Sequence, residues 1–179
     1  MKEKNIIRTR RYESPCGALT LGSVGDRLCL CDWQAQKRRE QVAERLKRML
    51  NAEFAEGTSE IIETAARQLD EYFSGKRREF DVALLFVGTE FQKSVWDELL
   101  KIPYGTTVSY AEMARRIGRP QAVRAVANAI GANSISVFAP CHRVVGSDRS
   151  LTGYAGGIDA KRALLALESS AAGGAKSRL

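Results

Sequence analysis

The residues best suited to do chemistry are an adjacent cysteine and histidine, Cys141 and His142, which follow a proline. A thiol attacks only as its thiolate, so it needs a base or a positive charge close by. A histidine positioned by a carboxylate is such a base, and Glu168 is a candidate for that carboxylate. Neighbours in sequence need not touch, although a water could relay the proton between them. A buried cysteine beside a surface histidine is the alternative, and the pair alone does not separate the two.

The other three cysteines offer no second reactive centre. Cys29 and Cys31 stand two apart in an apolar run, so we expect both to point to one face of a strand and pack in the core. Cys16 follows a proline and precedes a glycine, which is typical of a turn. No two cysteines have C-x-x-C spacing, and His142 is the single histidine. The sequence therefore predicts no disulfide framework, no metal site and no cofactor.

The elements that must position this reactive pair lie in the C-terminal half. We expect a helix that opens at Thr89 and a final helix over residues 159–168. Between them, a helix over residues 110–117 and another over residues 120–132, with Pro120 in its first turn, are separated by a glycine-containing turn. Two short helices joined in this way are typical of a helix-turn-helix, but also of helical hairpins that never touch DNA.

The second helix of that pair is unusual because nearly all its residues are small. Val123, Val126 and Ile130 recur at helical spacing and should face the core. The outward face then consists of three alanines and one arginine: Ala122, Arg124, Ala125 and Ala129. Such a surface cannot read base edges, but it permits close approach to a shallow minor groove with one arginine reaching inward. Tight packing against another helix is the alternative.

The N-terminal half has the pattern of a scaffold. Three strand-like runs predict a small antiparallel sheet, at residues 6–12, 18–24 and 28–33. A helix over residues 37–51 follows, and a second helix begins after Thr58, its expected N-cap, and ends at Gly75. Residues 81–87 are expected to form a last short strand.

These patterns divide the chain near Gly88. We expect an N-terminal α/β scaffold domain over residues 1–88 and a mainly helical domain, which carries the helix-turn-helix and the reactive pair, over residues 89–168. Residues 169–179 are small and polar, and we expect them to be a disordered tail.

Composition and charge restrict the class of protein further. The 179 residues are 44% hydrophobic and 27% charged, and no window reaches the ~18 apolar residues of a membrane span. The N-terminus has no apolar segment of a secretory signal, so we expect a soluble cytoplasmic protein without membrane contact. The net charge is +7, and residues 110–149 contain six arginines against Glu112 and Asp148. Such an excess suits a phosphate backbone, although many modestly basic surfaces are merely solvated.

Several motifs around the reactive pair occur in one characteristic order. They are Gly105-Thr106-Thr107-Val108-Ser109-Tyr110, Arg119-Pro120, Arg124-Ala125-Val126, Gly131-Ala132-Asn133, Pro140-Cys141-His142-Arg143-Val144, Gly153-Tyr154-Ala155-Gly156-Gly157, and Lys161, Leu164-Leu165 and Glu168. With them, residues 89–168 closely resemble the O6-alkylguanine-DNA alkyltransferases, or methylated-DNA–protein-cysteine methyltransferases. A looser resemblance, including Leu30-Cys31-Asp32-Trp33, extends through the N-terminal half. The resemblance to this family implies DNA repair by direct reversal of damage. It also implies a ribonuclease-H-like N-terminal domain and a winged-helix-like C-terminal domain.

The resemblance also implies the catalytic roles. Cys141 would be the nucleophile and the permanent acceptor of an alkyl group from O6 of guanine. His142 would take the thiol proton through a water, and Glu168 would orient that histidine. Tyr110 would protonate or hydrogen-bond N3 of the departing guanine. Asn133 would hold the turn around the reactive segment.

The DNA contacts follow from the same resemblance. The backbone at Val144 and the loop of Tyr154, Ala155 and Gly156 would bind the guanine edge and wall the pocket. Arg124 would fill the stack that the flipped base leaves. The other residues on DNA would be Arg119, Ala122, Ala125 and Ala129. The partner would be double-stranded DNA carrying O6-alkylguanine, bound in its minor groove with little sequence preference. We expect a monomer; cooperative assembly on DNA and action on O4-alkylthymine stay open.

The alkylated thiol has no hydrolytic route back, so each molecule would act once. Three features depart from the family pattern: Arg149 stands where a glycine is usual, Ser134 replaces a common proline, and no histidine is present for the zinc that some relatives hold in the N-terminal half. Three other classes stay possible. A non-catalytic lesion binder would lack the thiol, a helix-turn-helix regulator would prefer one DNA sequence, and a cysteine hydrolase would turn over repeatedly.

Overall fold

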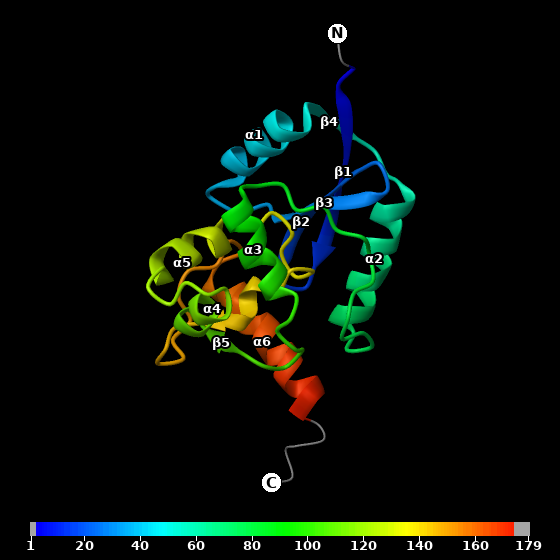
Figure 1. Cartoon of the computed structure of the whole chain (residues 1–179). Coiled ribbons are helices and arrows are strands. Elements are labelled where there is room, and N and C mark those ends of the chain that lie inside the picture. The colour runs from blue at the N-terminus through cyan, green and yellow to red at the C-terminus, as the bar shows by residue number, and fades with distance from the viewer. Residues whose placement is uncertain (1–2, 174–179) are drawn as a thin grey trace.

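The computed structural model describes residues 3–173 and joins a four-stranded sheet to a group of helices (Figure 1). Strands β1 (Asn5–Ser14), β2 (Gly17–Val24) and β3 (Arg27–Trp33) are antiparallel neighbours, as their alternating pattern predicts. A fourth strand, β4 (Ala52–Glu56), pairs with β1 in parallel and completes the order β3-β2-β1-β4. The α/β class is confirmed, and the sheet is mixed because of this last pairing.

The sequence pattern missed β4 and placed a strand elsewhere. Residues 81–87, expected as a strand, form only an isolated bridge between Leu84 and Leu28. Two backbone hydrogen bonds, Leu28 N–H to Ala83 and Leu85 N–H to Leu28, make up that contact. Strand β4 contains one large apolar residue, Phe54, so its strand character comes from pairing with β1 rather than from a pattern of its own.

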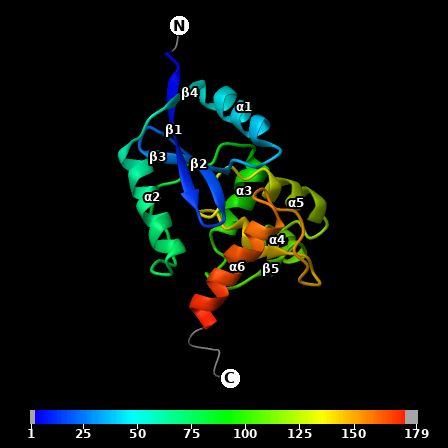
Figure 2. The same cartoon turned by 180° about the vertical axis from the view of Figure 1, so that it is seen from behind.

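Two helices pack on the sheet, α1 (Arg39–Leu50) and α2 (Glu60–Phe73), on its two sides in Figures 1 and 2. The expected cap Thr58 is wrong by one residue. Ser59 is the N-cap, and its hydroxyl accepts a hydrogen bond from the amide of Ile62 at 3.1 Å. The Thr58 hydroxyl instead donates to the Glu63 carboxylate at 2.5 Å. Both residues are acceptable N-caps, so the sequence could not choose between them.

A β-bulge separates two cysteines that were expected on one face. The register between β2 and β3 shifts at Gly22 and Ser23, which pair with Leu30 and Leu28 and leave Cys29 as the extra residue. Cys29 then packs in the core beneath α1, and Cys31 packs in the core beneath α2. Both are fully buried, as predicted, but the shared face was wrong because a bulge breaks the two-residue alternation.

The C-terminal half is built from four helices with a small parallel pair of strands. The elements are α3 (Glu90–Leu99), β5 (Val108–Ser109), α4 (Tyr110–Arg116), α5 (Val123–Gly131), the 3-10 turn η1 (Cys141–Arg143), β6 (Val144–Val145) and α6 (Ile158–Gly173). Thr89 opens α3 with a full capping box to Gln92, and the Ser109 hydroxyl caps α4. Helices α4 and α5, joined by a turn, form the predicted helix-turn-helix.

Two boundaries in this half differ from expectation. Helix α5 begins at Val123 rather than at Pro120, because residues 119–122 close a separate turn in which the Ala122 amide bonds the Arg119 carbonyl at 2.9 Å. Helix α6 continues to Gly173, so the predicted disordered tail is helical over residues 169–173. Its serines and alanines permit helix, and the sequence gives no stop signal before Gly173. The rest of that predicted tail, residues 174–179, lies outside the described residues.

Hydrogen bonds connect the two halves of the chain at the residues that precede the reactive segment in the sequence. The Cys31 amide donates to the Ser134 carbonyl, and the Ser136 amide donates to the Cys31 carbonyl, both at 2.8 Å. From α1, the Arg45 guanidinium donates to the Ala132 carbonyl at 2.8 Å and lies over the Trp96 ring. The sheet and α1 thus hold the end of α5 and the segment leading to Cys141.

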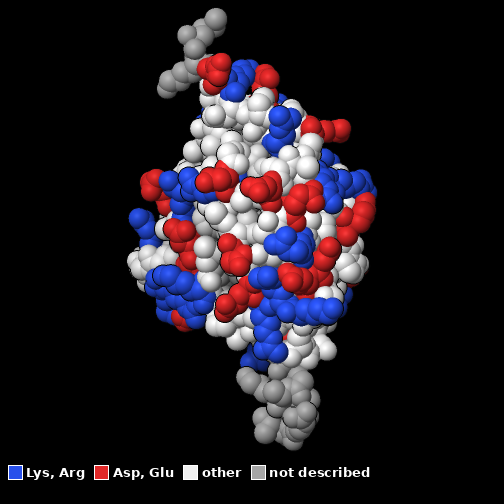
Figure 3. Space-filling model, turned by 90° about the vertical axis from the view of Figure 1, so that its right-hand side faces the viewer, with Lys and Arg blue, Asp and Glu red and all other residues white. Residues whose placement is uncertain are grey.

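The face seen in Figure 3 carries basic and acidic side chains interspersed, without a large area of one sign. Within residues 3–173, no helix combines the length and apolar character needed to cross a membrane.

Candidate active site

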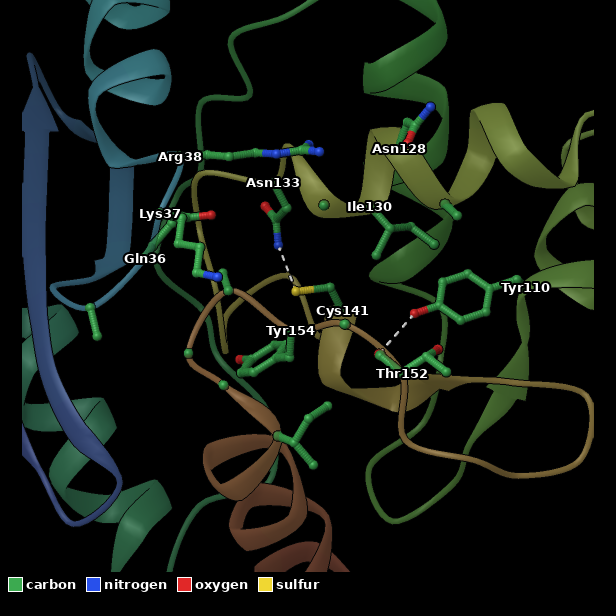
Figure 4. Close-up of a pocket in the computed structure, with 18 of the residues that line it drawn as sticks. Gln36, Lys37, Arg38, Tyr110, Asn128, Ile130, Asn133, Cys141, Thr152 and Tyr154 are labelled. Atoms are coloured by element: carbon green, nitrogen blue, oxygen red, sulfur yellow. Dashed lines mark hydrogen bonds between the residues drawn. The ribbon is translucent and has the colours of Figure 1, made fainter.

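Cys141 lies at a cavity of about 1000 Å³ that four segments enclose (Figure 4). These segments are residues 35–38 after β3, Tyr110 at the start of α4, one side of α5, and residues 152–158 leading into α6. The cysteine side chain is 5% exposed, so its sulfur can be reached only through this space. A cavity of this size is ample for a substrate.

Asn133, directly after α5, holds the sulfur in place. Its side-chain amide donates to Cys141 Sγ at 3.3 Å and to the Ala139 carbonyl at 3.0 Å, while its oxygen accepts from the Ile135 amide at 3.0 Å. The residue is 2% exposed. One buried side chain therefore fixes both the loop before Cys141 and the position of the thiol, and it offers a donor that favours the thiolate.

The backbone before Cys141 is strained. Val137 has a φ of 72°, and the Phe138 amide bonds the Ser136 carbonyl at 2.8 Å, which closes a γ-turn around a buried β-branched residue. A residue of this kind in such a turn costs of order 1–3 kcal/mol. The hydrogen bonds to β3 at Ser134 and Ser136 hold the turn in place.

His142 and Glu168 form a fully buried pair behind the thiol. His142 Nε2 lies 2.7 Å from Glu168 Oε2, and the two side chains are 0% and 1% exposed. Burial, which outweighs the attraction of Glu168, lowers the pKa of His142, so the imidazole is neutral at pH 7. Because the carboxylate is ionised, Nε2 must carry the hydrogen and Nδ1 the free lone pair. That Nδ1 is buried and has no hydrogen-bond partner among the described residues.

Glu168 is the centre of a larger polar cluster. Arg143 binds it with two nitrogens, at 2.8 and 2.9 Å, the Tyr72 hydroxyl donates to it at 2.6 Å, and the Gly105 amide at 3.3 Å. Burial alone would raise the pKa of this carboxyl, but the hydrogen bonds from His142 and Arg143 and the charge of Arg143 outweigh it and hold the pKa well below its usual range. Glu168 is therefore a permanent anion that fixes the histidine ring.

The thiol itself is protonated at neutral pH. Burial raises the pKa of Cys141 above its usual 9.0, although the Asn133 hydrogen bond and the charge of Lys161 act in the opposite direction. Fewer than about 1 in 100 molecules would hold a thiolate at pH 7 without help. The site therefore needs a base that acts during the reaction.

Tyr110 and the loop of residues 152–156 form the wall across the cavity from Asn133. The Tyr110 hydroxyl lies 3.5 Å from the Thr152 carbonyl, and burial raises its pKa, so it is a neutral donor. Lys161, fully buried, donates to the Thr152 carbonyl at 3.0 Å and to the Val144 carbonyl at 2.7 Å. Val144 does not line the cavity, and its carbonyl already has a partner.

Trp33 from β3 supports the same loop. Its indole donates to the Tyr154 hydroxyl at 3.2 Å, and the two rings meet edge to face. A Cβ on Gly156 would lie 2.7 Å from the Trp33 ring, so only glycine fits there. Tyr154, Ala155 and Gly156 all line the cavity, as expected.

Helix α5 presents part of its predicted outer face. Arg124 and Ala125 are exposed, Ala122 is half-buried, and Arg124 also borders the cavity. Ala129 was expected to face outward and is instead 3% exposed, because its backbone carbonyl accepts from the Trp96 indole at 2.8 Å and α3 covers it. Arg119 is exposed and lies over the Phe91 ring, on the loop between α4 and α5.

Two family models match the chain in succession. The 6-O-methylguanine DNA methyltransferase ribonuclease-like domain matches residues 7–86, and the DNA binding domain of the same name matches residues 90–170. The chain belongs to the 6-O-methylguanine DNA methyltransferase family. The resemblance seen in the motifs is thereby confirmed.

Individual relatives agree with the family models along nearly the whole chain. The methylated-DNA–protein-cysteine methyltransferase of Methanosarcina acetivorans is 43% identical over 159 residues, which cover 89% of this chain and 96% of the relative. That of Methanosarcina barkeri is 46% identical over 87% of this chain and 93% of the relative. Among solved structures, Mycobacterium tuberculosis OGT in complex with DNA matches with a TM-score of 0.79 at 43% identity, covering 93% of this chain and 94% of that one.

The structure adds residues at the candidate site that the sequence pattern did not reveal. Arg143 and Tyr72 complete the cluster on Glu168, and residues 36–38 of the N-terminal half line the cavity. Arg143 could have been suspected, since a charge between His142 and an apolar pair must find a buried partner. Tyr72 and residues 36–38 carried no such signal. No group of three or more potential metal ligands occurs within residues 3–173.

Proposed function

We propose that this protein repairs double-stranded DNA by moving an alkyl group from O6 of guanine to Sγ of Cys141, as a methylated-DNA–protein-cysteine methyltransferase. The observation that carries the proposal is the placement of the Cys141 thiol at a substrate-sized cavity with the buried His142–Glu168 pair behind it. Metal ions and cofactors have no part in the proposed chemistry, since a thiol and a base suffice for displacement at an alkyl carbon.

The proton leaves the thiol toward His142. Nδ1 of His142 carries the free lone pair, and a water between it and Sγ would pass the proton along. The imidazolium that forms is stabilised by the ionised Glu168 at Nε2. Asn133 donates to the sulfur as charge develops on it. His142 is thus the general base, Glu168 its orienting partner and Asn133 the positioning residue.

The leaving group needs a donor in its turn. As the S–C bond forms, the C–O6 bond breaks and its electron pair passes into the guanine ring. Tyr110, neutral and facing the cavity, would donate to N3 of that guanine. If Tyr110 gives its proton to the departing guanine, neutral guanine and a tyrosinate result, and the proton held on His142 then passes through water to the tyrosinate, so that both residues end neutral. Tyr154, Ala155 and Gly156 would form the wall of the base pocket.

DNA would meet the exposed side of α5. Ala122 and Ala125 leave room for close approach to the minor groove, with contacts to phosphate and little sequence preference. Arg124, exposed and beside the cavity, would enter the base stack while the damaged nucleotide is turned out. Arg119 would add a phosphate contact. The Val144 backbone contributes through the strand pair with β5 rather than as part of the cavity wall.

The thioether product cannot be hydrolysed, so each molecule acts once. We further propose two domains that meet near Gly88, a scaffold over residues 1–88 and a reactive, DNA-binding domain over residues 89–168. A cytoplasmic, monomeric protein fits this role.

The test is a titration of the protein with an excess of O6-methylguanine duplex while repaired guanine is counted. One guanine restored per protein molecule, and none for Cys141→Ala in a sample that still binds DNA, is the expected result. Repeated turnover would indicate a hydrolase, and binding without repair a lesion binder. Strong preference for one undamaged sequence would indicate a regulator.

A further inference from the structure

The wall of the cavity opposite α5 comes from the N-terminal half. Gln36, Lys37 and Arg38, directly after β3, line the same space as Cys141 (Figure 4). Lys37 and Arg38 are exposed, and their side chains run along the edge of the cavity. Two exposed cations therefore border the same cavity as Arg124.

This segment is anchored. The Gln36 side chain, 8% exposed, donates to the buried Asp32 carboxylate, and the Gln36 amide bonds the Trp33 carbonyl at 3.1 Å. Nη1 of Arg38 lies 3.6 Å from where a Cβ on Gly131 would stand, at the C-terminal end of α5. The partial negative charge of that helix end favours a guanidinium there. The positions of the two cations are thus set by β3 on one side and by α5 on the other.

The two charges are not neutralised locally. Within residues 3–173, no carboxylate oxygen lies within 4 Å of a side-chain nitrogen of Lys37 or Arg38. By contrast, Lys47 on α1 pairs with Glu44 at 3.3 Å. Two unpaired cations at an open edge attract an anion.

The size of the cavity indicates which anion. About 1000 Å³ is at the upper limit of sites that enclose a drug-sized molecule, so an alkylated base alone would leave much of it empty. A nucleotide turned out of the duplex brings its sugar and flanking phosphates to the mouth, where Lys37 and Arg38 stand.

We propose that Lys37 and Arg38 bind backbone phosphate of the strand that carries the flipped nucleotide, so that this strand is held between α5 and the N-terminal half. The proposal rests on the proposed function. It makes the N-terminal half a second DNA-contacting surface in addition to a scaffold. Each phosphate contact of this kind releases about 0.9 counterions on B-DNA.

The experiment compares the double variant Lys37→Gln/Arg38→Gln with Lys47→Gln/Arg48→Gln, which removes the same charge from exposed positions on α1 outside the cavity. Affinity for undamaged and O6-methylguanine duplexes is measured from about 50 to 200 mM salt, a range in which phosphate contacts dominate the change. We expect the slope of log K against log salt to fall in magnitude by about 1–2 for the first variant only.

The rate of alkyl transfer from a free alkylated base is measured in parallel, and the first variant should lose less rate on the free base than on the duplex. A slope equal to that of the control variant would overturn the proposal. Equal losses on free base and duplex would also overturn it, because the two side chains would then shape the base pocket instead. Binding to undamaged duplex needs no alkyl transfer, so failure of the proposed chemistry would be seen separately, as wild-type protein that binds DNA but gains no alkyl group.

Discussion

Replacing His142 with glutamine should convert the pH dependence of alkyl transfer from flat to steep. In the wild-type protein the buried imidazole has a lowered pKa and stays neutral above about pH 6.5, and the thiol has a pKa above 9.0. Thiol and base together then hold one transferable proton throughout this range. The rate should therefore be constant between about pH 6.5 and 9 and should fall at lower pH, where the imidazole is protonated.

Without the base, only the small thiolate fraction reacts. With a thiol pKa above 9.0, that fraction is below about 1% at pH 7, so His142→Gln should lose at least about 100-fold in rate. This equals about 2.7 kcal/mol of activation free energy. The loss should shrink tenfold for each pH unit added, since the thiolate fraction grows by that factor.

The assay is single-turnover transfer from an O6-methylguanine duplex across the pH range, with thermal unfolding and DNA affinity as controls for folding. Glutamine is chosen because its amide can still donate to Glu168. A variant that binds DNA and keeps the wild-type rate at pH 7 would refute the base role of His142. So would a rate that is lowered but independent of pH.

Three further outcomes are expected. Arg124→Ala should weaken repair in duplex DNA more than transfer from free alkylated base, and equal losses in the two rate measurements would contradict a role in the base stack. Arg149 has a φ of 67°, so Arg149→Gly should raise the free energy of unfolding by about 0.5–1 kcal/mol in denaturant titrations, and an unchanged midpoint would be evidence against strain there. Acid should destabilise the protein in two stages. The free energy of unfolding should fall below about pH 6.5, because His142 takes up a proton in the unfolded protein but resists it in the folded one. It should fall again below about pH 4.5, because the pKa of Glu168 is lower in the folded protein than in the unfolded one. Chemical unfolding at several pH values measures both stages, and stability that rises on acidification would contradict them.

Local features of this fold could be predicted from the sequence because short-range chemistry determines them. Thr89 opens its helix as expected, the helix expected after residue 109 begins at Tyr110, and the first three strands follow their alternating pattern. Arg149, which stands where a glycine is usual, has the positive φ that a glycine would adopt without strain. Errors arose where two local choices are nearly equal, as at Thr58 and Pro120, or where tertiary pairing decides, as in β4.

In the site, too, features that local sequence determines could be predicted, whereas features that depend on tertiary contacts could not. The order of the motifs suggested that Cys141, His142, Asn133 and Glu168 act together, and the structure places them in two hydrogen-bonded pairs, Asn133 with Cys141 and His142 with Glu168. Periodicity states which face of a helix is buried but not what covers it, so Ala129 was assigned to the wrong side. Tyr72 on α2 and residues 36–38 reach the site from the other half of the chain, through contacts that no local pattern reports.

The central claim is that Cys141 is the permanent acceptor of the alkyl group. Its most direct test is the intact mass of the protein after incubation with an O6-methylguanine duplex, followed by peptide mapping. The account predicts that each molecule gains one methyl group, located on Cys141, and that Cys16, Cys29 and Cys31 stay unmodified. A folded, DNA-binding sample without added mass, or with the methyl group on another residue, would contradict it.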